Sequence, residues 1–380
     1  MTQIKKNNAE RKDTISLLAD LIGYRSTADN TQDIRKGLEH IASLFFRTRA
    51  RTRISEHQGI PSLLISVGSG NHLRPRILLN GHFDVVPSQS ASAFSLRVRG
   101  SRAYGRGAQD MKGGLVALIM RIKEWASVPH PPEVGLLITG DEETGGTNGT
   151  RHMVHTIGLA PRFVIVGDAS QRAYYTIITK EKGGLWLEVT TAGKSAHGAR
   201  PWLGDNAADT LMKAIADIRS LVRVVNEDVW KNSCTVSVMH TFNTTPNIVP
   251  DRARAVLDIR FTEKLARTPE ELLRRIRAHV KNADITALAT ISLFTTPEKH
   301  PDVRLFQQAA SRAYGHPVPF GYGHAASDAR YFAEAGIPTV MIGTVGDNWH
   351  AEGEWVDLES ISLVGKIIRT YADAVTSARR

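Results

Sequence analysis

Histidine and carboxylate side chains follow short apolar runs at several places in the chain, and glycine lies beside them each time. The first such segment, LLNGHFDVVP at residues 78–87, runs out of an apolar stretch into His82 and Asp84. A histidine that binds a metal through one ring nitrogen needs an acceptor for its other N–H, and a carboxylate two residues further along an extended chain lies on the same side. The pair therefore indicates a metal ligand with a supporting carboxylate, while a structural histidine at a strand end would give the same pattern.

Two acidic segments add carboxylates in comparable positions. In GRGAQDMKGG, residues 105–114, Asp110 lies between glycines just before an expected helix, where it can face a ligand or cap the helix. No Gly-Lys-Ser/Thr follows these glycines, and an acid would repel phosphate, so they do not indicate a phosphate-binding loop. In LLITGDEETGG, residues 136–146, three consecutive acids end an apolar run. One glutamate of this run can bind a metal while its neighbour faces the water on that metal, unless the segment is a solvated surface turn.

Two more residues complete the set. Asp168 follows the apolar run 163–167, and His350 lies in DNWHAEGE at residues 347–354. Each segment is a weak signal alone. Together they supply two histidines and three or four carboxylates, a set of nitrogen and oxygen ligands that suits a pair of Zn²⁺-type ions bridged by one carboxylate.

The composition is that of a globular protein. The chain has 380 residues, of which 42% are hydrophobic and 23% charged, and this excludes the collagen-like and disordered classes. The length predicts two domains, or one large domain with a smaller insertion. Its one cysteine, Cys234, excludes an intramolecular disulfide, so any metal must be held by histidines and carboxylates. The single cysteine and a polar N-terminus with no apolar segment behind it predict a cytoplasmic protein without a membrane span.

The net charge is +10, from 48 Lys and Arg residues against 38 Asp and Glu. Such a charge fits either nucleic acid or an anionic small substrate. Arginines at positions 47, 49, 51 and 53 would line one face of a strand. No Arg-Gly-Gly tract, aromatic-flanked basic run or zinc knuckle accompanies them, so we expect a solvated strand face and no nucleic-acid partner.

The elements that must position the candidate ligands alternate between strands and helices. Residues 10–50 predict two helices, the first beginning at a Thr14 cap and the second including residues 34–46. Apolar runs at 62–67, 76–80, 134–139 and 163–166 predict strands, and residues 114–125 predict a helix between them. This order predicts an α/β domain with a central sheet flanked by helices. In such sheets functional residues collect in the loops beyond the strand ends.

The order of elements changes after residue 181. Strands are predicted at 184–191, 234–241, 253–261 and 286–294, with helices at 206–225 and 269–281. This β-α-β-β-α-β order is the ferredoxin-like unit, a complete small α+β domain. A helix at 303–314, a strand at 338–342 and a long helix at 358–378 then resume the α/β pattern. We therefore predict a domain of residues 182–294 inserted into a larger domain of residues 1–181 and 295–380.

The same segments resemble the M20 metallopeptidase family, which includes aminoacylases, acetylornithine deacetylases, succinyl-diaminopimelate desuccinylases and dipeptidases. The resemblance rests on GHFDVVP, GRGAQDMKGG, TGDEETGG, VGDAS, AGKSAHGARP, TTPNIVPDRARAVLDIRF, SDARYF and the late His350, in the family's order over nearly the whole chain. It implies two divalent metal ions, zinc in preference to cobalt or manganese. The positions that match the family's ligands are His82 and Asp168 for one ion, Glu143 and His350 for the other, and Asp110 as the bridge.

The resemblance also implies roles around the ions. Asp84 would orient His82, and Glu142 would be the general base that takes a proton from the bridging water and later passes it to the leaving amine. The inserted domain would be a lid and dimerisation domain, from which His197 would reach into the active site of the partner in a homodimer. His197 can otherwise be a surface-loop histidine. The positions that match substrate contacts are Asn247, Arg260, Ser327, Asp328 and His324.

Arg260 matches the position that contacts the substrate's carboxylate, for which a guanidinium fork is suited, although it can also be a structural strand arginine.

Two departures from the family pattern affect the prediction of the substrate. Deacylating members usually carry Glu-Pro where this chain has Asp168-Ala169, and Asp is typical of the dipeptidase and aminopeptidase members, whereas the length and the short lid are typical of the deacylases. Desuccinylase-like members carry a Gly-Gly-Thr run where this chain has GHAA at residues 323–326, so His324 should reshape the pocket.

We therefore expect a dinuclear zinc amidohydrolase that cleaves the C–N amide bond of a small substrate with a free carboxylate, such as an N-acyl amino acid. A dipeptidase or aminopeptidase of the same family is the nearest alternative. A hydrolytic deaminase of an aromatic amine stays open because the pocket is altered. A non-catalytic scaffold is disfavoured because both Glu142 and Glu143 are present.

Overall fold

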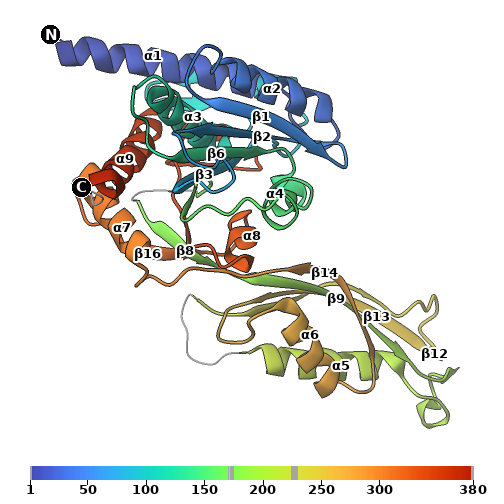
Figure 1. Ribbon diagram of the computed structural model, residues 1–380. Coiled ribbons are helices and arrows are strands. Elements are labelled where there is room, and N and C mark those ends of the chain that lie inside the picture. Colours follow the sequence, from blue (N-terminus) through green and yellow to red (C-terminus); the bar gives the residue numbers. More distant parts are fainter. Residues whose placement is uncertain (1, 170, 172–174, 224–229, 378–380) are drawn as a thin grey trace. The chain divides into compact units, whose positions relative to one another are not determined.

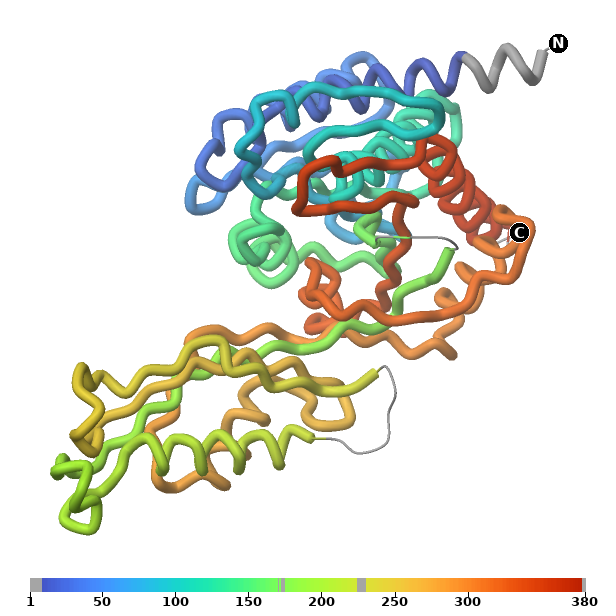
Figure 2. The backbone as a smooth tube through the Cα atoms, turned by 180° about the vertical axis from the view of Figure 1, so that it is seen from behind, coloured from blue at the N-terminus to red at the C-terminus, as the bar shows by residue number. Residues whose placement is uncertain are grey.

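The structure is a computed structural model that describes residues 2–169, 171, 175–223 and 230–377 (Figures 1 and 2). The chain divides into two compact units. The first contains Met1–Thr179, Thr296–Gly321 and Ser327–Arg380, and the second contains Lys180–Thr295 and Tyr322–Ala326. Among the helices that the structure describes, none combines the length and the apolar character needed to cross a membrane.

A nine-stranded mixed sheet is built mainly from the first unit. Its strands lie in the order β1, β2, β6, β3, β7, β17, β8 and β15, with β16 also paired to β8. Their bounds are Arg51–His57 (β1), Ile60–Val67 (β2), Ile77–His82 (β3), Val134–Thr139 (β6), Val164–Val166 (β7), Ile177–Glu181 (β8), Phe294–Thr295 (β15), Phe320–Gly323 (β16) and Thr339–Met341 (β17). Every residue of β3, β6 and β7 is buried. Because successive side chains point to opposite faces, these strands are covered on both sides, and only the loops at their ends can open to solvent.

The central strands β6, β3 and β7 are parallel neighbours. His82 pairs with Thr139 at the ends of β3 and β6, and Val166 at the end of β7 pairs with Asn80, two residues before His82. The carboxyl ends of parallel strands meet at one edge of a sheet. The acidic turn after β6 and Asp168 after β7 therefore lie at the same edge as His82.

Helices pack around this sheet. They are α1 (Thr2–Ile22), α2 (Thr31–Ser43), α3 (Gly113–Ala126), α4 (Thr150–His155), α7 (Pro301–Tyr314), α8 (Ala329–Glu334) and α9 (Leu358–Ser377). Figures 1 and 2 both show α7 and α9 side by side, and the rings of Phe163, Phe306 and Tyr371 join these helices to the strand region at centroid distances of 5.2–6.2 Å. The predicted α/β fold with a central sheet and flanking helices is confirmed.

Several local features differ from the sequence-based expectations. α1 begins at Thr2 rather than at a Thr14 cap. Thr14 lies within the helix, where its hydroxyl donates to the carbonyl of Glu10, one turn earlier, at 2.9 Å. β1 begins at Arg51, because the chain turns at Arg47, whose φ is 62°, before it becomes extended. The predicted strand 286–294 is divided into β14 and β15. Four residues of the quoted motifs and predicted helices lie outside the described residues, namely 170, 224, 225 and 378.

A second, small sheet of the first unit joins two loops that carry candidate ligands. Its order is β18 (Gly346–Asp347), β19 (Trp355–Asp357), β5 (Arg102–Tyr104) and β4 (Arg97–Arg99). His350 lies in the connection between β18 and β19, and Asp110 lies in the segment that follows β5. Because β19 and β5 are antiparallel neighbours, the two loops start from adjacent strands at the same end of the sheet.

The second unit has a four-stranded sheet of its own, in the order β11, β13, β9 and β14. The bounds are Gly183–Ala192 (β9), Ala207–Val222 (α5), Ser233–His240 (β11), Arg252–Phe261 (β13), Pro269–His279 (α6) and Asp284–Ile291 (β14), and a separate short pair is formed by Ala196–His197 (β10) and Ile248–Val249 (β12). Figure 1 shows α5 and α6 on one face of this sheet. The second unit has a hydrophobic core separate from that of the first. It contains side chains with no exposed surface from the strands, Leu187 and Leu257, and from the helices, Ile218 and Ile276.

Candidate metal centre

Six of the predicted side chains converge at the carboxyl edge of the parallel strands. They form two groups, one of His82, Glu142 and Asp168 and one of Asp110, Glu143 and His350. Within each group, every residue offers one nitrogen or oxygen atom, and these atoms lie within 4.8 Å of one another. Side chains brought from five separate segments of the chain thus face two common points, which is the arrangement that metal ligands require.

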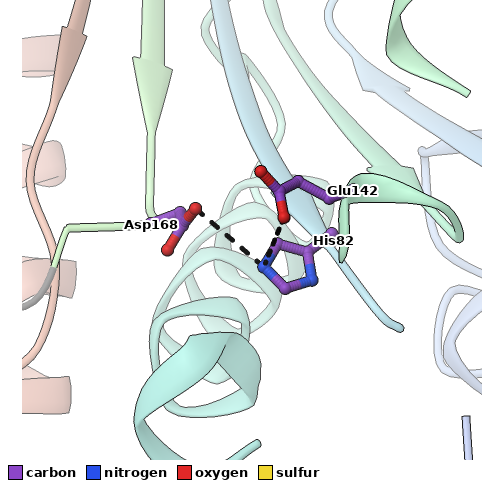
Figure 3. A group of neighbouring side chains, drawn as sticks. All are labelled: His82, Glu142 and Asp168. Carbon is purple, nitrogen blue, oxygen red and sulfur yellow. Dashed lines mark ion pairs between the residues drawn. The ribbon is translucent and has the colours of Figure 1, made fainter. Parts of the chain in front are cut away.

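The first group is centred on the ring of His82, which is 1% exposed. Figure 3 shows the carboxylates of Glu142 and Asp168 directed at the same ring nitrogen. The distances from His82 Nε2 are 4.0 Å to Glu142 Oε2 and 3.9 Å to Asp168 Oδ2. These separations exceed a direct hydrogen bond, so the atoms surround a common space.

Asp110 connects the two groups. Its Oδ1 lies 3.2 Å from His82 Nε2, and its Oδ2 lies 3.1 Å from Nε2 of His350. His350 Nε2 also lies 3.2 Å from Oε2 of Glu143. One carboxylate oxygen therefore faces each group, as expected of a ligand that bridges two ions.

The electrostatics of the site favour cations. Burial opposes the charging of His82, but hydrogen bonds to Asp110 and Asp84 raise its pKa well above the usual value. Hydrogen bonds to Asp110 and Glu143 raise the pKa of His350 to about 10. Burial raises the pKa of Glu142 well above its usual range. The clustered carboxylates thus stabilise the positively charged forms of both histidines. A divalent cation at the same place would be stabilised by the same negative charges.

The residues fit divalent metal ions. Oε1 of Glu143 is buried and has no hydrogen-bond partner among the described residues. A buried carboxylate oxygen without a partner is costly, and a cation between Asp110, Glu143 and His350 would remove that cost. Imidazole nitrogens and carboxylate oxygens without thiolates are ligands that suit zinc and the similar ions cobalt and manganese.

Asp84 supports the site in two ways. Its backbone carbonyl lies 2.9 Å from Nδ1 of His82, nearer than its carboxylate oxygen Oδ1 at 3.5 Å. The carboxylate accepts the backbone N–H of Glu142 at 3.2 Å and that of Glu143 at 2.9 Å. Asp84 therefore fixes the ring of His82 mainly through its backbone and fixes the turn that carries both glutamates through its side chain.

Asp328 lies beneath the acidic turn, buried in the first unit. Its Oδ2 accepts hydrogen bonds from the hydroxyls of Thr139 and Thr150. The turn passes so close to it that a Cβ on Gly146, whose φ is 61°, would lie 2.0 Å from Asp328 Oδ1. The neighbouring Ser327 is also buried, with its hydroxyl 3.4 Å from Sδ of Met341.

Two buried charged residues of the site region were missed by sequence reasoning. Lys112 has no exposed surface, and its Nζ donates to the carbonyls of Leu21 at 2.9 Å and Tyr24 at 3.1 Å. Glu354 is 3% exposed and accepts hydrogen bonds from the segment around Asp110. Both lie inside segments that the sequence singled out, but their partners are distant in sequence, so no local pattern indicates these contacts.

The remaining predicted residues lie in the second unit. His197 is exposed at the end of β10, and the carbonyl of Asn247 accepts the N–H of Gly198 beside it at 2.7 Å. The guanidinium of Arg260 is paired with the carboxylate of Asp258, at 2.8 Å from Nε and 3.2 Å from Nη2.

His324 lies in an aromatic cluster of the same unit. Its ring lies 5.9 Å from that of Tyr322 and 6.2 Å from that of Trp230, between ring centroids. Burial and the neighbouring Lys182 lower the pKa of His324. A glycine at this position would supply none of these contacts.

Two facing groups of histidine and carboxylate side chains at the carboxyl edge of a mixed α/β sheet are an arrangement that two-metal hydrolases use. The model of peptidase family M20/M25/M40 matches residues 78–375, and the chain belongs to this family. It is a hydrolase of C–N amide bonds, and the family implies divalent metal ions.

Similar proteins agree with this assignment. A succinyl-diaminopimelate desuccinylase of Acidiphilium cryptum is 29% identical over 379 residues, which cover 96% of this chain and 98% of that protein. One of Rhodospirillum centenum is 31% identical over 318 residues, covering 79% of this chain and 81% of the relative. Aminopeptidase PepT of Bacillus cereus has a TM-score of 0.79 at 18% identity, covering 96% and 99% of the two chains. The M20 metallo-carboxypeptidase Sso-CP2 of Sulfolobus solfataricus has a TM-score of 0.73 at 20% identity, covering 94% and 98%.

Proposed function

We propose that the protein is a dinuclear zinc-dependent hydrolase that cleaves the amide bond of a small, carboxylate-bearing substrate such as an N-acyl amino acid. The observation that carries the proposal is the pair of ligand groups joined by Asp110, with Glu142 beside them. Asp110 presents a different oxygen to each group, as a carboxylate shared by two ions would.

The assignment of the ligands follows the two groups, except that Glu142 is kept as the base. His82 and Asp168 would hold one ion, Glu143 and His350 would hold the other, and Asp110 would contribute one oxygen to each. When bound, the two cations supply an activated water and neutralise the negative charge that develops on the carbonyl oxygen. Zinc is the preferred ion because this ligand set combines imidazole and carboxylate, and cobalt or manganese would fit the same donors.

Glu142 is the general base of the proposal. It shares the turn of Glu143 but faces the His82 side of the site, where its Oε2 lies 4.0 Å from His82 Nε2. Its carboxylate takes a proton from the attacking water and later delivers it to the leaving amine nitrogen. Asp84 holds the backbone N–H groups of the turn, so it keeps this carboxylate in place.

The substrate class is inferred from the named relatives and from two departures. The relatives are named succinyl-diaminopimelate desuccinylases, which favours an N-acyl substrate with a free carboxylate. Asp168 followed by Ala169, typical of dipeptidases and aminopeptidases, favours a peptide as the second candidate. His324, which clusters with Trp230 and Tyr322, would give the substrate pocket a shape different from that expected of a desuccinylase.

We assign the second unit the role of a lid and dimerisation domain. His197 would support the oxyanion in the active site of the partner subunit. Asn247 and Arg260 would contact the substrate. Arg260 would then leave the carboxylate of Asp258 and bind that of the substrate. Ser327, Asp328 and His324 would shape the pocket.

An edge strand of the second unit supports the proposal of a homodimer. β11 is an edge strand of its sheet, and Met239 on it is 47% exposed, while Met212 on α5 is 54% exposed. An unpaired edge with exposed apolar side chains is suited to pairing with a second copy. The cytoplasm stays our prediction for the location of the protein.

A turnover screen tests the proposed function. The zinc-loaded protein is offered N-acetyl, N-succinyl and N-formyl amino acids, dipeptides and aromatic amines, with a chelated sample as control. We expect cleavage of N-acyl amino acids that the chelator abolishes and added Zn²⁺ restores. Cleavage of dipeptides alone would replace the substrate with the second candidate. No chelator-sensitive turnover of any class would contradict the proposal.

A further inference from the structure

Glu354 ends the loop that carries His350, and its side chain is 2% exposed. Glu352, two residues earlier in the same loop, is exposed to solvent. Burying a carboxylate is costly unless its oxygens accept hydrogen bonds, so the partners of Glu354 indicate what it does.

The partners of Glu354 all come from the segment that leads into Asp110. Oε1 accepts the backbone N–H of Gln109 at 2.9 Å and that of Asp110 at 3.1 Å. Oε2 accepts the backbone N–H of Gly107 at 2.9 Å and a hydrogen bond from Nη1 of Arg106 at 2.8 Å. Both oxygens are therefore satisfied by charge-assisted hydrogen bonds, which are the strong class.

The segment around Asp110 needs these acceptors. Asp110 (φ −121°, ψ 92°) and Met111 (φ −126°, ψ 26°) depart from helical geometry, and Gly107 has a left-handed φ of 79°. A backbone of this shape supplies few acceptors for its own N–H groups, and buried N–H groups must be paired. The carboxylate of Glu354 supplies acceptors for three of these N–H groups.

We propose that Glu354 is a positioning residue for the metal centre, tying the Asp110 loop to the His350 loop. The inference rests on the proposed function, because it concerns the ions of that site. Asp110 Oδ2 and His350 Nε2 approach to 3.1 Å from two loops that Glu354 connects. Its loss should therefore weaken the ion held by Glu143 and His350 more than the ion held by His82 and Asp168.

Calorimetric titration of the metal-free protein with Zn²⁺ tests the proposal, in the wild type, in Glu354→Gln and in the matched control Glu352→Gln. Glutamine keeps the size of the side chain but replaces one acceptor oxygen by an NH₂ group that would face two donors. We expect two ions for all three proteins. In Glu354→Gln the affinity for the ion assigned to Glu143 and His350 should fall by about 10- to 100-fold, the usual effect of losing a partner that orients a ligand. The ion assigned to His82 and Asp168 depends on this contact only through Asp110, so its affinity should fall less.

Several outcomes distinguish this inference from alternatives. A purely structural role would lower the midpoint of unfolding without separating the two affinities, and that result would overturn the proposal. Equal affinities in the wild type and in Glu354→Gln would overturn it while leaving the proposed function intact. A wild-type protein that bound no Zn²⁺ would instead refute the proposed function itself.

A second variant covers the case in which Glu354→Gln does not fold. Glu354→Asp keeps both acceptor oxygens but withdraws them by one methylene. We expect a smaller loss of affinity, again larger for the ion assigned to Glu143 and His350, and a matching change in the visible absorption of the Co²⁺-loaded protein. An unchanged titration and spectrum for this variant would overturn the proposal.

Discussion

Replacing Asp84 by asparagine tests how the turn of Glu142 and Glu143 is held. The side chain of Asp84 is 1% exposed, and each of its oxygens accepts one backbone N–H, from Glu142 at 3.2 Å and from Glu143 at 2.9 Å. Asparagine keeps the size but offers one acceptor oxygen, so one of the two N–H groups would face an NH₂ donor.

The expected magnitude follows from that single lost contact. A hydrogen bond to a charged group contributes about 1.5–3 kcal/mol, and a buried N–H left without an acceptor costs a similar amount. If the turn shifts to avoid the donor, Glu142 leaves its position and the loss appears in turnover. At about 1.4 kcal/mol for each factor of ten, kcat should fall by about 10- to 150-fold.

The assay compares Asp84→Asn with Asp302→Asn. Asp302 is a partly buried carboxylate of the first unit, paired with Arg76 at 2.7 Å and located on α7. Both variants should lose stability in urea denaturation, but only Asp84→Asn should lose turnover of the preferred substrate. Wild-type kcat in Asp84→Asn, or an equal loss of kcat in both variants, would refute the reasoning.

Three further predictions concern residues around the centre. Lys112→Met removes one donor from each of two backbone carbonyls, those of Leu21 and Tyr24, so the free energy of unfolding should fall by about 2 kcal/mol; an unchanged urea midpoint would exclude this role. Gly146→Ala should destabilise by about 2 kcal/mol more than Gly336→Ala, because both glycines have a positive φ but only the new Cβ at 146 would meet Asp328, at 2.0 Å. His197→Ala should lower kcat by about 100-fold or more with KM little changed, and full activity would argue against its oxyanion role.

That the candidate ligands lie together could be predicted because their signal is local. His82, Glu143 and Asp168 each follow an apolar run, and the run, the charged residue and the adjacent glycine all lie within a few positions. Because β3, β6 and β7 are parallel neighbours, three separate local signals lead to one place. The sequence pattern thus contained most of the candidate site and the alternating fold that supports it.

The supporting contacts could not be predicted because they join distant segments. Glu354 contacts the Asp110 segment from 244 positions away in the sequence, and Lys112 contacts Leu21 from 91 positions away. The expected Thr14 cap failed for a different reason, since a threonine within a helix can bond back to the preceding turn just as it can cap a new one. Residue type alone does not decide between these two uses.

The roles of the adjacent glutamates are the centre of the account. Glu142 is grouped with His82 and Asp168, and Glu143 with Asp110 and His350, so either glutamate is close enough to contact an ion. We assign Glu143 as a metal ligand and Glu142 as the general base. Isosteric glutamine variants separate the roles because they remove the charge without removing the side chain.

The most direct measurement is therefore the number of metal ions bound per chain, determined together with kcat, in Glu142→Gln and in Glu143→Gln. We predict that Glu142→Gln binds two ions with wild-type affinity and loses turnover by at least about 100-fold, the range of a missing general base. Glu143→Gln should retain only one tightly bound ion. Loss of an ion from Glu142→Gln, with both ions retained by Glu143→Gln, would contradict the account and reverse the two assignments.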